Sequence, residues 1–137
     1  MKETMTYGLW YLRNQNFQLT AYSNVDWENC VDERKRTSGR AFFLGDSLVA
    51  WLSKKKGSIS LSTIEAEYIA AATCCTQVLL MIQTLVDLEV KYSASIPIHC
   101  DNTSAISVSK NHVFHSKTKH IPIKYHFLRE QVTNQIV

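Results

Sequence analysis

Oxygen-donor side chains stand at three separate places in this chain where a divalent metal site could be assembled. The first place holds Asn24, with Asp26 two residues later; the second holds Glu67, and the third Asp101. Mg²⁺ and Mn²⁺ take such ligands, and paired ions can activate a water molecule and stabilise a leaving oxygen during phosphate-ester hydrolysis. Asn24 is a neutral amide where a metal-binding carboxylate is expected. The predicted chemistry is therefore metal-dependent hydrolysis, weakened at position 24.

Alternating polar and apolar residues predict the strand that carries the first of these positions. Residues 17–26 place Tyr22, Asn24 and Asp26 on one face and the apolar side chains on the other. The pattern predicts further strands at 7–13, 38–44, 47–52, 59–61 and 96–101, a turn at Gly45-Asp46, an exposed turn at 54–57, and helices at 103–110, capped by Asp101 or Asn102, and 121–132.

The clearest predicted element is a helix over residues 62–88, which opens with a capping-box sequence. Its apolar residues recur at alternating spacings of four and three from Ile64 to Leu85, which predicts one buried stripe. Glu67 lies in the first turn, off the centre of that stripe. A helix here can therefore present a carboxylate close to its own N-terminus.

The strand at 96–101 is most easily placed beside the strand at 17–26. That placement brings Asn24 or Asp26, Glu67 and Asp101 to one edge of the sheet, within reach of a common metal. Acids at helix starts and strand ends are also commonly structural, so spacing alone leaves both interpretations of Glu67 and Asp101 open.

The charge distribution favours a nucleic-acid partner. Residues 34–56 carry seven basic side chains against one acid, and residues 102–137 carry five against one. The segment between them, 57–101, carries five acids against one base. Two basic regions around an acidic one suit a phosphate backbone that passes a metal centre, although a solvated surface shows similar runs. The candidate nucleic-acid contacts are Lys54, Lys55, Lys56, Asn102, Lys117, Lys119 and Lys124.

The remaining composition indicates one domain in a reducing compartment. Four cysteines form no C-x-x-C pair, so small buried thiols are expected. Four histidines between His112 and His126 fit no zinc pattern and are expected in a loop or on a helix surface. No signal peptide or long apolar run is apparent, which predicts an intracellular protein without a membrane partner, in the cytoplasm or nucleus.

Several short motifs occur in a specific order along nearly the whole chain. They include Tyr22-Ser23-Asn24-Val25-Asp26-Trp27, Arg36-Thr37-Ser38-Gly39, Trp51-Leu52-Ser53-Lys54-Lys55, Ser62-Thr63-Ile64-Glu65-Ala66-Glu67-Tyr68, Cys100-Asp101-Asn102 and His120-Ile121-Pro122-Ile123-Lys124-Tyr125-His126. In this combination the chain strongly resembles the ribonuclease H domain at the end of the copia-type retrotransposon polyprotein.

The resemblance implies an α/β fold of the ribonuclease H type: a mixed sheet, with three antiparallel strands and at least one parallel strand, flanked by helices. It also implies Mg²⁺- or Mn²⁺-dependent hydrolysis of the RNA strand in RNA–DNA hybrids. By position, Glu67 resembles the family's helix acid and Asp101 its second-strand acid. Asn24 falls at the first aspartate of the family pattern Ser-Asp-Ala-Asp-Trp, and Asp26 matches the second.

The chain also departs from the family pattern. Besides Asn24, Pro122 stands where the family usually has aspartate, and the family continues into a fifth strand and a last, acid-bearing helix. Residues 1–14 are expected to be the tail of the connection to a reverse transcriptase domain together with the first hairpin strand, and 15–137 an incomplete ribonuclease H-like domain. Impaired catalysis is expected; the alternative is a non-catalytic nucleic-acid-binding or structural module derived from that domain.

Overall fold

The computed structural model describes residues 8, 18–26, 37–55, 63–92, 95–110, 121 and 123–137, and within these ranges all side chains except those of Asp26, Lys55 and Lys124. The predicted strands at 7–13 and 59–61, the boundary between 1–14 and 15–137, and three of the candidate lysines, Lys56, Lys117 and Lys119, lie outside the described residues.

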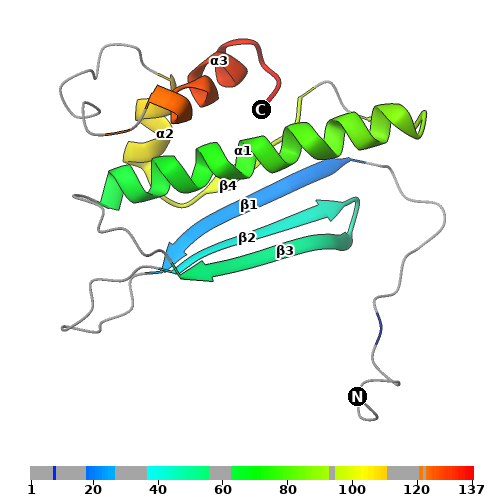
Figure 1. Ribbon diagram of the computed structural model, residues 1–137, viewed down its shortest axis with the longest axis horizontal. Coiled ribbons are helices and arrows are strands. Elements are labelled where there is room, and N and C mark those ends of the chain that lie inside the picture. The colour runs from blue at the N-terminus through cyan, green and yellow to red at the C-terminus, as the bar shows by residue number, and fades with distance from the viewer. Residues whose placement is uncertain are drawn as a thin grey trace.

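The described strands form one four-stranded sheet in the order β3-β2-β1-β4 (Figure 1). β1 is antiparallel to β2, β2 is antiparallel to β3, and β4 is parallel to β1. With the flanking helices, this arrangement confirms the predicted α/β, ribonuclease H-like fold class. The strands are β1 (Leu19–Asp26), β2 (Thr37–Leu44), β3 (Ser47–Lys55) and β4 (Ile98–Cys100).

The hairpin of β2 and β3 turns where the sequence predicts it. Gly45 has a φ of 60°, a conformation that glycine adopts without a Cβ clash, and its N–H donates to the Gln18 carbonyl at 2.9 Å. The prediction of an exposed turn from Lys54 is wrong at its start, because Lys54 and Lys55 still pair with β2. The pairing of β2 with β3 carries them to the end of the strand.

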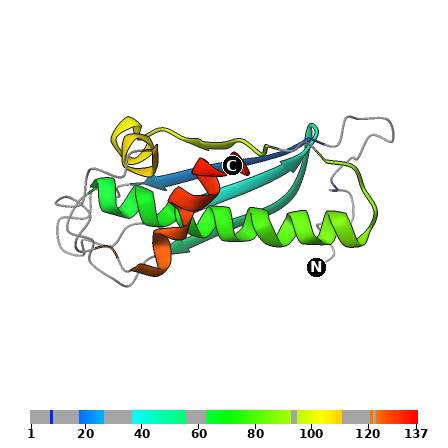
Figure 2. The same cartoon turned by 90° about the horizontal axis from the view of Figure 1, so that it is seen from above.

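The helix α1 (Thr63–Asp87) lies across one face of the sheet, and α2 (Thr103–Lys110) and α3 (Phe127–Thr133) pack on its far side (Figures 1 and 2). The core consequently has two parts on either side of α1. One joins Cys74, Val78 and Leu85 to β1 and β2, and the other joins Tyr68, Ala72 and Cys75 to α2 and α3.

This layering explains why α1 buries more than the single predicted stripe. Ala66, Ala70 and Cys74 are also buried, because the helix has a neighbour on both sides. Length and composition alone would let α1 cross a membrane. In the fold, its apolar side chains instead contribute to both parts of the core.

The predicted single helix at 121–132 is interrupted. A short 3₁₀ helix, η2 (Ile123–Tyr125), precedes α3, and the His126 N–H donates to the Ile123 carbonyl at 2.9 Å, a bond that spans three residues. The α-helix starts only after His126, which occupies its N-cap without a side-chain capping bond.

β4 is shorter than the predicted strand at 96–101. The Ala21 N–H still donates to the Pro97 carbonyl at 3.0 Å, which continues the contact with β1 beyond β4. On the other side, the Ile96 N–H donates to the Ile136 carbonyl at 2.9 Å. The segment after α3 therefore pairs with part of the backbone that precedes β4.

Candidate metal centre

Three elements meet at one end of the sheet, where the first turns of α1 lie beside the ends of β1 and β4 (Figure 1). In the parallel pairing of β1 with β4, Ser23 is the partner of Cys100. Asn24 and Asp101 each follow one of these partners along the chain. The pairing register therefore places two of the predicted site residues at the same end of neighbouring strands.

Glu67 supplies the third predicted position from α1. It is 6% exposed, and the Cys100 thiol donates a weak hydrogen bond to its Oε2 with a sulfur–oxygen distance of 3.9 Å. Metal-ligating atoms of Glu67, Cys100 and Asp101 all lie within 4.8 Å of one another. The structure thus brings Glu67 and Asp101 together, and it adds a thiol to them.

Asn24 has an exposed side chain on β1 and lines an open pocket of about 420 Å³ together with Cys100 and Asp101. The pocket connects the end of β1 to the end of β4, so the amide of Asn24 and the carboxylate of Asp101 border one space. The residues that line it are Tyr22, Ser23, Asn24, His99, Cys100 and Asp101.

Cys100 is half-buried and Ser23 is buried, both beside polar groups. Burial raises the pKa of the Cys100 thiol, the backbone hydrogen bond at Asn102 lowers it, and the neighbouring acids Glu67 and Asp101 raise it further. Ser23 is 3% exposed, and its Oγ has no hydrogen-bond partner in the part of the chain that the structure describes. A buried hydroxyl without a partner costs stability, so this one is notable beside three potential ligands.

Asp26 is the last residue of β1 and pairs with Thr37. The pairing of β1 with β2 runs from Leu19 to Asp26 without a register shift. An extended strand separates alternate residues by about 6.6 Å. The backbone of Asp26 therefore lies further along the strand than that of Asn24, and no bulge in the β1–β2 pairing brings the two positions together.

The predicted nucleic-acid contacts are only partly described. Lys54 has an exposed side chain and pairs with Ser38, which in turn pairs with Val25 next to Asn24, so Lys54 lies at the site end of the sheet. Lys55 ends β3 and Lys124 lies in η2, but their side chains fall outside the description.

Asn102 has a clear structural role. Its Oδ1 accepts a hydrogen bond from the Ala105 N–H at 3.0 Å, which is the N-cap bond that the sequence predicts for this helix start. This bond fixes the side chain of Asn102, the residue that directly follows Asp101. Whether it contacts nucleic acid stays a prediction.

Sequence reasoning missed several neighbours of the site. Cys100 and Ser23 were not singled out, although the pairing of a strand ending at Cys100 with β1 could have indicated them. Tyr22 and His99 stack with ring centroids 4.8 Å apart and an interplanar angle of 20° on the exposed face of the sheet. This aromatic pair borders the same pocket as Asn24.

An aromatic and cationic cluster lies around Tyr68, the residue that follows Glu67 in α1. The Tyr68 hydroxyl lies 3.4 Å from Nδ1 of His126, and the Arg129 guanidinium lies 5.7 Å from the Tyr68 ring centroid. Burial raises the pKa of Tyr68, and Arg129 lowers it in part. The cluster joins α3 to the residue that follows Glu67.

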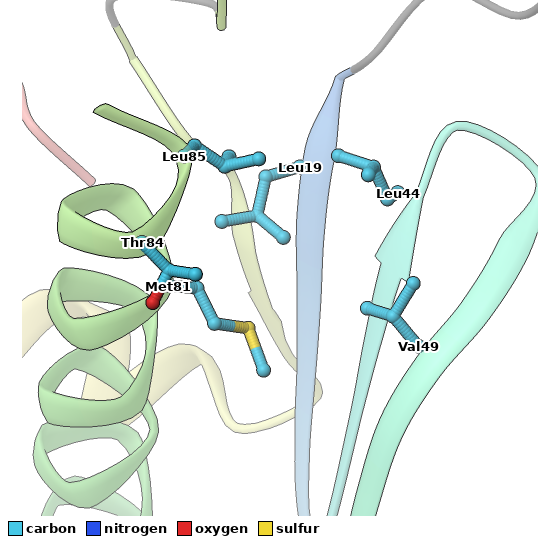
Figure 3. A pocket seen from close by; sticks show the side chains of 6 residues that line it. All are labelled: Leu19, Leu44, Val49, Met81, Thr84 and Leu85. Atoms are coloured by element: carbon cyan, nitrogen blue, oxygen red, sulfur yellow. The ribbon is translucent and has the colours of Figure 1, made fainter. Parts of the chain in front are cut away.

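A second hollow, of about 220 Å³, lies at the opposite end of β1 and α1 (Figure 3). Apolar side chains surround it, and Thr84 is the only lining residue with a polar side-chain atom. It offers no donor set for a metal or a phosphate. Its lining residues are Leu19, Leu44, Val49, Met81, Thr84 and Leu85.

Over most of its length the chain is similar to retrovirus-related Pol polyproteins of transposons. No protein-family model matches the chain. Over 129 residues, 94% of its length, the chain is 35% identical to the retrovirus-related Pol polyprotein from transposon RE2 of Arabidopsis thaliana. Over 117 residues, 85% of its length, it is 35% identical to the corresponding polyprotein from transposon TNT 1-94 of Nicotiana tabacum.

These matches cover a small part of the relatives. The chain spans 9% of each of the two polyproteins. A shorter match of 70 residues, 51% of the chain, is 41% identical to secreted RxLR effector protein 161 of Plasmopara viticola and covers 49% of that protein. The chain is therefore a homologue, over nearly all of its length, of one short region of the retrovirus-related Pol polyproteins of transposons.

Proposed function

We propose that this chain is a ribonuclease H-like domain of a copia-type retrotransposon polyprotein, which binds RNA–DNA hybrids and hydrolyses their RNA strand slowly or not at all. Its partners are the hybrid and the reverse transcriptase domain of the same polyprotein. It acts inside the cell, in cytoplasmic virus-like particles or in the nucleus.

One observation carries this proposal: Glu67 from α1 and Asp101 from the end of β4 lie within ligand distance of one another, beside the pocket that Asn24 borders. Two carboxylates fit Mg²⁺, which usually binds one or two of them and completes its shell with waters and substrate phosphates. When bound, Mg²⁺ or Mn²⁺ would activate the attacking water and stabilise the leaving oxygen. Glu67 is only 6% exposed, so its carboxylate has little room to move.

Two features of the site support slow cleavage. Asn24 offers a neutral oxygen where a carboxylate would add negative charge, so this side chain attracts a cation less strongly. The Cys100 thiol also contacts Glu67, and a thiol is a poor partner for a hard cation.

Lys54, at the same end of the sheet, is placed to attract a phosphate backbone.

The same features favour a second candidate, a non-catalytic nucleic-acid-binding or structural module. The stacked pair of Tyr22 and His99 is exposed beside Asn24 and offers a flat aromatic surface to a base. A module of this kind would bind hybrid without cutting it, or would only support a neighbouring polymerase domain.

A hybrid-cleavage assay separates these functions. The unmodified chain and Asn24→Asp are incubated with end-labelled RNA–DNA hybrid and Mg²⁺ or Mn²⁺. We expect Asn24→Asp to raise the cleavage rate about tenfold or more, because a charged ligand strengthens metal binding. Adding Asp101→Asn should abolish the gain. The matched control Asp87→Asn removes an acid at the other end of α1 and should not change the rate.

Robust cleavage by the unmodified chain that Asp101→Asn abolishes would contradict the impaired state. If neither chain cuts, binding of hybrid measured by fluorescence anisotropy decides between the remaining functions. Affinity that falls steeply with salt indicates a nucleic-acid-binding module, and no binding indicates a structural one.

A further inference from the structure

A cysteine thiol, a possible sulfur ligand, lies beside the two carboxylates of the candidate site. Cys100 lies close to both Glu67 and Asp101, with possible ligand atoms of all three within 4.8 Å of one another. Thiolates are soft ligands that favour Zn²⁺ and similar cations, whereas Mg²⁺ takes oxygen ligands almost alone. The donor set in the described structure is thus mixed, with two hard oxygens and one soft sulfur.

The separation of Cys100 and Glu67 is close to that of two ligands of one tetrahedral ion. With Zn–S near 2.3 Å and Zn–O near 2.1 Å, a sulfur and an oxygen bound to the same ion lie about 3.6 Å apart. Cys100 Sγ and Glu67 Oε2 are 3.9 Å apart, so a closure of about 0.3 Å would bring them to that separation. Side-chain rotation supplies shifts of this size without a backbone change.

Ser23 gives an independent indication of a ligand here. Its buried Oγ has no partner among the described residues, it pairs in register with Cys100, and it lines the same pocket as Cys100 and Asp101. Residues that surround a metal ligand usually donate hydrogen bonds to it or to a bound water. The Ser23 hydroxyl is placed for that role.

We propose that Glu67, Cys100 and Asp101 form a binding site for a thiophilic divalent cation such as Zn²⁺, in which Cys100 supplies the anionic donor that Asn24 lacks. On binding, the Cys100 thiol releases its proton to solvent and a sulfur–metal bond forms. The inference rests on the proposed function in one respect: both assign metal binding to Glu67 and Asp101. A bound Zn²⁺ would occupy them and compete with Mg²⁺.

Cd²⁺ titration of the chain tests the sulfur ligand directly, because a Cd²⁺–thiolate bond gives an ultraviolet charge-transfer band. A Cys30→Ser background removes the cysteine that lies outside the described residues. We expect a saturable band in this background. Cys100→Ser should abolish the band and weaken Cd²⁺ binding, measured by calorimetry, about tenfold or more. Cys75→Ala, about 12 Å further along α1 than Glu67, is the matched control and should keep the band.

A second measurement needs no substitution. Zn²⁺ should slow alkylation of Cys100 by iodoacetamide, located by peptide mass spectrometry, while Mg²⁺ at the same concentration should not. A band that persists in Cys100→Ser, or equal alkylation of Cys100 with and without Zn²⁺, would overturn the proposal. Neither readout uses nucleic acid, so a chain that fails to bind hybrid but binds Cd²⁺ through Cys100 contradicts the proposed function alone.

Discussion

Cys74 and Cys75 are adjacent in the chain but belong to different parts of the core. Cys74 packs toward the sheet, and Cys75 packs toward α2 and α3. The sequence predicts buried thiols, and the structure confirms it for both. Burial raises the pKa of Cys74 to about 12, opposed in part by Arg40, and raises that of Cys75 to about 11. Through these two thiols, the free energy of unfolding depends on pH in the alkaline range.

The free energy of unfolding should fall as pH rises above about 9. Below that pH both thiols are protonated in both states. Above it, the unfolded chain loses these protons while the folded chain keeps them up to about 11 or 12, which favours unfolding by at most about 1.4 kcal/mol per pH unit for each thiol. Urea denaturation between about pH 8 and 11, with reductant, measures the slope. Cys74→Ala should make it shallower; an unchanged slope would contradict the assignment.

At the scale of elements, α1 contributes most to the core, because among the described residues it supplies buried side chains to both of its parts. Leu85 is 8% exposed and packs toward the sheet, whereas Leu80, little more than a turn earlier, is 59% exposed. The same residue type in one helix thus occupies two environments that differ only in the face of α1.

Leu85→Ala should lower the free energy of unfolding by about 2–5 kcal/mol, because it removes buried methyl groups and leaves a cavity. Leu80→Ala is the matched control and should cost less than about 0.5 kcal/mol. Chemical denaturation followed by circular dichroism measures both. Equal costs would mean that the two faces of α1 are packed alike, contrary to the structure.

The sequence predicted most of these elements because their signals are local. Alternation marks β1, β2 and β3, Gly45 marks the turn, and the capping-box sequence marks the start of α1. The interruption before α3 and the shortness of β4 depend on tertiary contacts, such as the bond from Ile96 to Ile136, that no local pattern encodes. The convergence of Glu67 and Asp101 followed from strand order. The position of Cys100 beside Glu67 required the pairing register and the packing of α1.

At the scale of the whole molecule, the helices lie on one face of the sheet (Figures 1 and 2). The final residues contact both the sheet edge and the helices. Ile136 accepts the backbone bond from Ile96, and Val137 packs against both parts of the core. The last two residues therefore connect the edge of the sheet to the helical layer.

Deleting Ile136 and Val137 should destabilise the chain more than replacing both with alanine. The alanine variant keeps two backbone hydrogen bonds of residue 136, one from the Ile96 N–H to its carbonyl and one from its own N–H to the Gln131 carbonyl. The difference should therefore be about 2 kcal/mol, the net contribution of two hydrogen bonds. Thermal and urea denaturation of the two variants give the comparison. Equal stabilities would show that these two backbone bonds contribute nothing.

The two faces of β1 also set how the protein can change over generations. Leu19, Ala21 and Ser23 are buried against α1, whereas Tyr22 and Asn24 are exposed on the opposite face. Substitutions on the buried face are opposed by folding itself, whereas position 24 is exposed and a change there leaves the core intact. A carboxylate at position 24 can thus be replaced by an amide while the fold stays intact. Conservation of the fold and conservation of nuclease activity are therefore separate properties of this protein.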